Sequence, residues 1–188
     1  VRQVHGDGVL RREDWRSMEE VADAVWTSSP ELPCTILTAD CLPVLLCARD
    51  GSAVAAAHAG WRGLAGGVLP ATIRRMTDDP GSLMAWIGPG IGMRAYEVGE
   101  DFRDEFRARL PWLEDGFHEI GGQVHAELAA IARSILAHEG VVDVHGGDFC
   151  TYTEADRFFS HRREPGGGRM ATTIWIESDP AASPYRPL

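Results

Sequence analysis

Residues 34–47 read CTILTADCLPVLLC, and residues 54–63 follow as VAAAHAGWRG. The first stretch is almost continuously apolar, which is typical of a strand that is buried on both faces. Pro43 has no N–H to donate to a neighbouring strand, so it predicts a bulge or a strand end within this stretch. The alanine-rich run at 54–59 predicts a second buried strand, which ends at Gly60.

Other segments of the chain alternate between strand and helix patterns. We expect further strands at 83–87, 141–145 and 170–176, and helices at 12–25, 63–76, 97–110 and 123–139. Pro70 is expected to kink the second of these helices or to lie in its first turn. This alternation predicts a mixed α/β domain over residues 1–178. The Pro- and Ser-rich residues 179–188 are expected to form a loose C-terminal tail.

Composition excludes several classes of partner. The 188-residue chain has 18 basic and 28 acidic residues, a formal net charge of -10, which argues against a nucleic-acid or anionic-membrane partner. No apolar stretch is long enough for a transmembrane helix, and no charged-then-apolar leader opens the sequence. The four cysteines lack the spacing of a disulfide framework, so we expect a cytoplasmic location.

Three residues suggest a metal site when they are considered together. Alone, His58 in its alanine strand is best explained as a core histidine, and Cys41 as a small apolar residue. Cys41 however follows Asp40, a carboxylate that a buried strand does not tolerate without a partner. With His5 beside Gly6, two imidazoles and a thiolate come from separate elements and leave one position open, which is the pattern of catalytic zinc.

Short motifs along the chain resemble those of the laccase-domain family. They are RQVHG (2–6), TADCLPVLL (38–46), AAAHAGWRG (55–63), IGPGIG (87–92) with YEVG (96–99), CTY (150–152), and FFSHRR (158–163) with GRMA (168–171). The resemblance implies an αββα layered fold with mixed sheets, similar to that of cysteine-hydrolase toxins. It also implies zinc held by His5, Cys41 and His58. Family members carry a further N-terminal segment that is expected to be absent here.

Bacterial members of this family are described as purine nucleoside phosphorylases, and the resemblance implies phosphorolysis of adenosine and inosine with adenosine deaminase activity. The expected partners are a purine nucleoside and inorganic phosphate. Because a guanidinium matches phosphate geometry, Arg62, Arg94 and Arg162 are the predicted anion-binding residues. Arg62 is expected near the metal with a catalytic role beside Cys41 and Asp40, and Asp40 acts either as a general base or as an orienting residue.

Other activities remain open at this point. Cys41 paired with a histidine suits a cysteine amidase acting on peptidoglycan precursors, to which family members have also been linked. Copper at the same ligands suits a polyphenol oxidase, but a multicopper enzyme needs a further cluster and the seven histidines include no HxH pair. A metal-binding protein without activity is the third alternative. The oligomeric state is open, a homo-oligomer included.

Overall fold

A computed structural model describes residues 1–17 and 19–178. Six strands form the main sheet, in the order β1 (Val9–Arg11), β2 (Ala24–Thr27), β5 (Val54–Ala59), β4 (Leu42–Ala48), β6 (Leu83–Ile87) and β10 (Asp143–Gly146). The central pairs β2–β5, β5–β4 and β4–β6 are antiparallel, whereas β1 and β10 join the two edges in parallel. The sheet is therefore mixed, and the predicted mixed α/β domain is confirmed.

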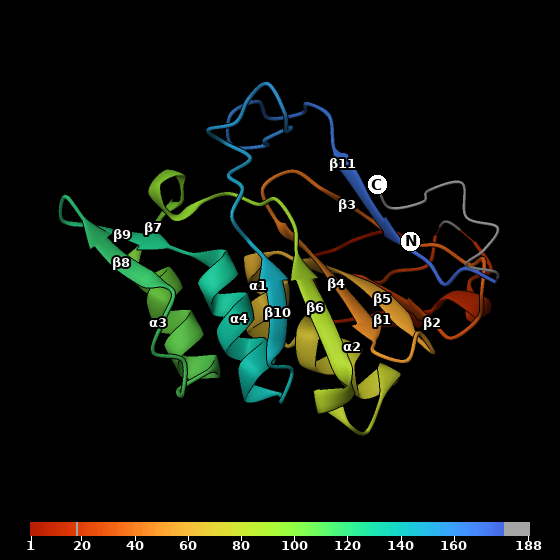
Figure 1. Ribbon diagram of the computed structural model, residues 1–188. Coiled ribbons are helices and arrows are strands. Elements are labelled where there is room, and N and C mark those ends of the chain that lie inside the picture. The colour runs from red at the N-terminus through yellow and green to blue at the C-terminus, as the bar shows by residue number, and fades with distance from the viewer. Residues whose placement is uncertain (18, 179–188) are drawn as a thin grey trace, which may run out of the picture.

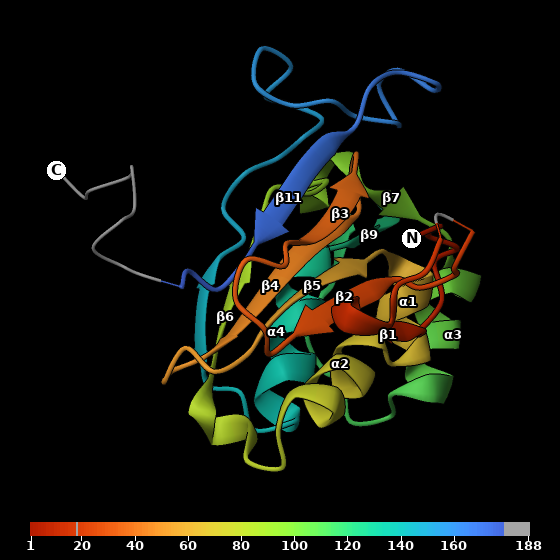
Figure 2. The ribbon, with the colours of Figure 1, turned by 90° about the vertical axis from the view of Figure 1, so that its right-hand side faces the viewer.

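Helices cover one face of this sheet, and a two-stranded sheet lies over the other (Figures 1 and 2). The helices are α1 (Trp61–Gly66), α2 (Val68–Met76), α3 (Glu100–Arg109) and α4 (Leu128–His138), and the small sheet pairs β3 (Cys34–Thr38) with β11 (Met170–Ile174). Of the four layers that the family resemblance implied, the described residues supply one helical layer and two sheets.

A third sheet of three short strands lies beside α3 in Figure 1. Its strands are β7 (Glu97–Val98), β9 (Gln123–Ala126) and β8 (Phe117–Ile120). Rings of Phe102 and Phe106 from α3 pack against Phe117 of β8, with centroids 6.2 and 5.6 Å apart. Trp61 at the start of α1 joins this cluster at 4.8 Å from Phe102. The aromatic cluster therefore ties the third sheet to the helix that follows β5.

The alternation of side chains along β5 decides where His58 points. Ala55, Ala57 and Ala59 belong to the core between the main sheet and the helices, whereas Val54 and Ala56 pack in the core shared with β3. Successive residues of a strand face opposite sides, so His58 continues the row of Val54 and Ala56. Its imidazole thus points away from the helices, on the face of the small sheet.

The apolar run at 34–47 is two strands in two different sheets and not one strand. β3 pairs with β11, the chain turns at residues 39–41, and β4 enters the centre of the main sheet. Asp40 adopts a φ of 88°, in the left-handed region that side-chain-bearing residues rarely occupy. This turn carries the chain between sheets, and it places Cys41 at the point of crossing. Pro43 lies near the start of β4, as expected of a strand end.

Two predicted helices are wrong in part. Among the described residues of 12–25 are the 3-10 turn Arg12–Asp14 and the start of β2. Val21 and Val25, which a helix would place on one face, differ in burial, because Val21 is exposed and Val25 is buried. The predicted helix at 123–139 begins only at Leu128, because residues 123–126 form β9.

The helix expected at 63–76 breaks at Gly67, and Pro70 lies in the first turn of α2, as predicted. The loose tail expected at 179–188 lies outside the described residues. Within the described part of the chain, no helix has both the length and the apolar character needed to cross a bilayer.

Candidate metal centre

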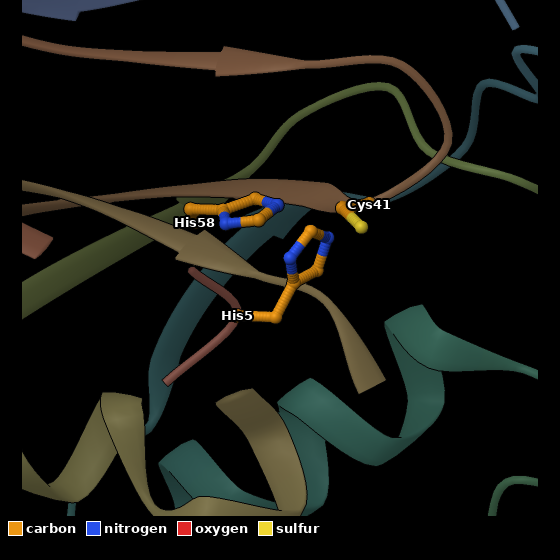
Figure 3. A group of neighbouring side chains, drawn as sticks. All are labelled: His5, Cys41 and His58. Carbon is orange, nitrogen blue, oxygen red and sulfur yellow. The ribbon is translucent and has the colours of Figure 1, made fainter. Parts of the chain in front are cut away.

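His5, Cys41 and His58 meet at one end of the main sheet (Figure 3). His5 lies in the loop before β1, Cys41 in the turn before β4, and His58 near the end of β5. Their ligand atoms all lie within 4.8 Å of one another. Zinc binds imidazole nitrogen and thiolate sulfur at about 2.0–2.3 Å, so two atoms bound to one ion lie at most about 4.6 Å apart, which is close to the spacing here. The donor set and its spacing therefore fit the metal that the sequence predicted.

Asp23 holds the imidazole of His58 from the side away from Cys41. The two residues are direct cross-strand neighbours, because the backbone N–H of His58 donates to the carbonyl of Asp23 at 2.7 Å. The Asp23 carboxylate Oδ1 lies 2.8 Å from His58 Nδ1, and both side chains are buried. A carboxylate only accepts hydrogen bonds, so Nδ1 carries the proton and Nε2 is left as the nitrogen available to a metal.

The same carboxylate fixes the loop that carries His5. The backbone N–H groups of Val4, His5 and Gly6 donate to Asp23 at 3.2, 2.9 and 2.7 Å. Burial alone raises the pKa of Asp23, but its bonds to His58 and to these three amides lower the pKa below the usual value. His5 itself adopts a φ of 63°, a strained conformation that this anchoring maintains.

Gln3 provides a second anchor for the N-terminal loop. Its side-chain amide donates to the carbonyl of Leu37 and accepts from the N–H of Leu37, both at 2.8 Å. The amide thus pairs with the free edge of β3 in place of another strand. The His5 loop is therefore held between the main sheet and the small sheet.

Cys41 has the electrostatic setting of a thiolate ligand. Burial raises the pKa of its thiol, but the hydrogen bonds and charges of His5 and His58 outweigh this and lower the pKa to about 7. Burial likewise lowers the pKa of His58, whereas Asp23 and the Cys41 sulfur raise it to about 9. The site thus favours a negative sulfur beside a positive charge, which a bound cation also supplies.

Gly60 gives the ligands room to converge. A Cβ atom at this position would lie 2.8 Å from the Cys41 sulfur and 3.2 Å from Cδ2 of His5. Real Cβ atoms do not approach a sulfur so closely, so any larger residue displaces one ligand or the other. Glycine is thus required here for close approach and not for an unusual backbone conformation, because the φ of Gly60 is -69°.

The three candidate ligands line a cavity of about 660 Å³, within the range typical of small-molecule sites. Tyr96 forms part of its wall. Burial is the main cause that raises the pKa of its phenol to about 12. The Tyr96 ring packs edge-on against Phe102 of the aromatic cluster at 5.9 Å. The other lining residues are Val1, Gln3, Leu37, Thr38, Ala39, Asp40, Ile91, His161, Arg162 and Arg169.

Asp40 orients a loop and not a metal ligand. Its carboxylate accepts from the Thr151 hydroxyl at 2.6 Å and from the backbone N–H of Arg162 at 2.7 Å. The turn that carries Cys41 is thereby joined to the segment that carries Arg162. These bonds reach no metal ligand, so the orienting role expected for Asp40 applies to this segment, and the carboxylate that holds a ligand imidazole is that of Asp23.

The structure separates the predicted anion-binding arginines. Arg162 lines the cavity, with its guanidinium carbon 5.4 Å from the centre of the Tyr96 ring. Arg62 and Arg94 are exposed and are not among the lining residues, and Arg62 stacks on Trp61 at 4.3 Å. The neighbouring Arg163 donates to three carbonyls, those of Thr151, Tyr152 and Phe158.

Several residues of the site were not singled out from the sequence. Asp23 lies in the apolar run VADAV, and a carboxylate among small apolar residues was the same signal that had drawn attention to Asp40. His161 of the FFSHRR motif and Arg169 of the GRMA motif both line the cavity. His125 lies within the helix expected at 123–139 but is a buried residue of β9, and its Nδ1 lies 3.0 Å from the carbonyl of Met93.

Comparison with known proteins assigns the family. Residues 1–177 match the profile of a family described as multi-copper polyphenol oxidoreductase laccase. The chain belongs to this laccase-domain family. Curated relatives include the Escherichia coli protein named purine nucleoside phosphorylase YfiH, 46% identical over 94% of this chain and 72% of its own length. A Pseudomonas aeruginosa protein, also named purine nucleoside phosphorylase, is 45% identical over 93% of this chain and 72% of its own length.

Solved laccase-domain structures share the fold. A crystal structure of a Neisseria meningitidis protein has 47% sequence identity and a TM-score of 0.87, over 93% of this chain and 73% of that one. YfiH of Bacillus licheniformis, at 32% identity, has a TM-score of 0.82 over 93% of this chain and 72% of its own. The arrangement of layers described above is therefore the arrangement of the laccase-domain family.

The family description and the names of the relatives point to different chemistry. Multi-copper oxidation needs a further copper cluster fed by several histidines. Within the described residues, His5, Cys41 and His58 are the one group of three or more ligand-type side chains found close together. All seven histidines of the laccase-domain chain are described, and no two of them form an HxH pair. The ligand set thus suits a single metal ion.

Proposed function

We propose that this laccase-domain chain is a metal-dependent purine nucleoside phosphorylase, with residues 1–178 acting as one catalytic domain. The observation that carries the proposal is the convergence of three metal ligands on a cavity whose wall includes an aromatic ring and two arginines. A cavity of about 660 Å³ has room for a nucleoside together with phosphate. The names of relatives with 45–46% identity support the same reaction.

Each element of the cavity has a part in the proposed reaction. Arg162 and Arg169 bind phosphate, because a guanidinium offers parallel N–H donors to two phosphate oxygens. Tyr96 presents a ring face on which a purine base can stack. The bonds of Asp40 to Thr151 and Arg162 keep the phosphate-binding segment in register with the metal ligands. Holding both substrates in one orientation is the main contribution of such a site to the reaction rate.

Zinc is the proposed metal, held by His5, Cys41 and His58. Zinc supplies Lewis-acid polarisation and lowers the pKa of bound water to about 7, which suits adenosine deamination at the same centre. The hydrogen bond of Asp23 to Nδ1 of His58 leaves Nε2 as the nitrogen that would bind zinc, and the cation would replace the imidazole charges in keeping Cys41 ionised. Copper can compete for these ligands, because copper(II) outranks zinc in affinity.

The first test is release of free base from adenosine and inosine by zinc-loaded protein, followed by chromatography. We expect adenine and hypoxanthine only when phosphate is present, and inosine formed from adenosine without it. Removal of the metal with a chelator is expected to abolish both reactions, and added zinc to restore them. Full activity in protein that metal analysis shows to be free of zinc and copper would contradict the metal-dependent mechanism.

Substitution Arg162→Ala is expected to raise the KM for phosphate by roughly 2- to 5-fold, because Arg162 is exposed to solvent and an exposed charged pair contributes about 1 kcal/mol or less. Steady-state kinetics at varied phosphate and saturating inosine measure this effect. Arg74→Ala is a suitable control, since it removes an arginine with 67% side-chain exposure from α2. Arg62→Ala, tested in parallel, shows whether the exposed arginine beside Trp61 also contributes. An unchanged KM in Arg162→Ala would exclude Arg162 from the phosphate site.

A cysteine amidase acting on peptidoglycan precursors is the second candidate function. The contact of the Cys41 sulfur with two imidazoles favours it, because the same pair of groups activates cysteine nucleophiles. A thiolate bound to zinc is a poor free nucleophile, so the two functions require opposite metal states. Amide hydrolysis by metal-free protein that zinc suppresses would support the amidase.

The four cysteines also bear on the proposed location. Cys34, Cys41, Cys47 and Cys150 are all unpaired. Free thiols persist in a reducing compartment, so we propose that the protein is cytoplasmic. Its net charge of -10 supports small-molecule partners and not nucleic acid.

A further inference from the structure

We propose that Asp23 is a positioning residue that assembles two of the three metal ligands through a single buried carboxylate. This inference rests on the metal centre of the proposed function, and it adds a residue outside the ligand set. Asp23 comes directly before β2 and lies across from His58 of β5. Its side chain is fully buried, and it contacts both the His58 ring and the loop of His5.

The carboxylate accepts four hydrogen bonds, one from the His58 ring and three from the backbone of the loop that carries His5. Oδ1 accepts from His58 Nδ1 at 2.8 Å and from the backbone N–H of His5 at 2.9 Å. Oδ2 accepts from the backbone N–H groups of Gly6 at 2.7 Å and Val4 at 3.2 Å. One rigid group thus fixes the ring orientation of His58 and the backbone position of His5. Both ligands are therefore positioned relative to the same carboxylate.

Charge balance supports the same role. Two neutral imidazoles and one thiolate leave a divalent cation with one uncompensated positive charge. The Asp23 carboxylate supplies the second negative charge through His58, without occupying a coordination position. Burial of a carboxylate far from any cation costs free energy. A metal ion bound to His58 would reduce this cost, because it would place a positive charge close to Asp23.

A purely structural role is the alternative to be excluded. Three of the four partners of Asp23 are backbone amides, and holding the N-terminal loop to the sheet accounts for those contacts alone. The two roles differ at His58. A positioning residue sets which ring nitrogen carries the proton, and a loop anchor does not.

The first test compares zinc affinity in wild-type protein, Asp23→Asn and Asp143→Asn by competition with a chromogenic chelator. Asparagine is isosteric, but its NH2 group cannot accept the hydrogen bonds that one carboxylate oxygen accepts. We expect Asp23→Asn to weaken zinc binding by roughly 10- to 100-fold, the range for partners of metal-bound histidines. Asp143→Asn breaks a matched carboxylate–imidazole contact, 2.7 Å to the exposed His145, and is expected to bind zinc as the wild type does.

The second test uses nitrogen NMR of the imidazoles, and its first measurement needs only wild-type protein. In zinc-loaded wild-type protein we expect His58 to be protonated at Nδ1 and metal-bound through Nε2. In folded Asp23→Asn we expect this preference to be lost. Metal binding through Nδ1, or equal zinc affinity in the wild type and Asp23→Asn, would overturn the inference and leave the proposed function intact. Failure of wild-type protein to bind zinc would overturn both.

Discussion

Cys41→Ala is expected to abolish tight zinc binding and, with it, both phosphorolysis and deamination. The thiolate is the one charged donor among the three candidate ligands, and the two imidazoles that remain lie at an open cavity. Because a ligand itself is lost, the fall in zinc affinity should exceed the roughly 10- to 100-fold that follows loss of an outer-shell partner. Zinc content after dialysis and base release from inosine measure the two effects.

Cys47→Ala is the matched control for this variant. Cys47 is a half-buried thiol of β4 on the same face of the main sheet, and burial raises its pKa. We expect its substitution to leave zinc content and turnover close to wild type. Cys41→Ala protein that keeps wild-type zinc affinity but loses activity would contradict the metal-ligand role, and it would favour Cys41 as a nucleophile.

The second large effect is expected from Gly60→Ala, a change of one methyl group outside the ligand set. The new Cβ would lie 2.8 Å from the sulfur of Cys41, so the thiol must leave the position in which it faces His58. Overpacking of this kind costs about 1–3 kcal/mol, which a folded domain tolerates, but the metal site requires sub-ångström placement. We expect folded protein, seen as a cooperative thermal transition, with little or no bound zinc.

Gly66→Ala separates this effect from a general intolerance of alanine. A Cβ at Gly66, the last residue of α1, would meet nothing within 4 Å. Alanine favours helix more than glycine does, so this control is expected to keep wild-type zinc affinity and to gain up to about 1 kcal/mol in free energy of unfolding. Zinc affinity in Gly60→Ala equal to that in Gly66→Ala would show that the close approach is not required.

Two of the candidate ligands have some local evidence in the sequence, whereas His5 was added because it completes the set with them and because of the family resemblance. His58 within an alanine strand and Cys41 beside a carboxylate in an apolar run are each unusual in their own segment. The strands at 54–59 and 83–87 have the residue bounds that were predicted, because a short run of buried apolar residues between turn residues identifies a strand by itself.

Asp23 could not be found in this way, because its role depends on which strands pair. It lies beside His58 only because β2 and β5 are antiparallel neighbours with Ala24 opposite Ala57. The local sequence VADAV does not indicate which strand pairs with β2 or in which register. Arg162 and Arg169 likewise line the cavity although they are far from the ligands in the sequence, whereas Arg62, three residues after the end of β5, stacks on Trp61 and does not line it.

The sequence by itself thus indicated the α/β class, the strands at 54–59 and 83–87, and, with the family resemblance, the three candidate ligands. The tertiary structure alone decided that residues 34–47 divide between two sheets, that Asp40 binds Thr151 and Arg162, and that Asp23 holds His58. The physical reason is the separation along the chain over which each kind of interaction acts. Periodicity and side-chain chemistry act between residues close in the chain, whereas strand register and burial are set by contacts between segments far apart in it.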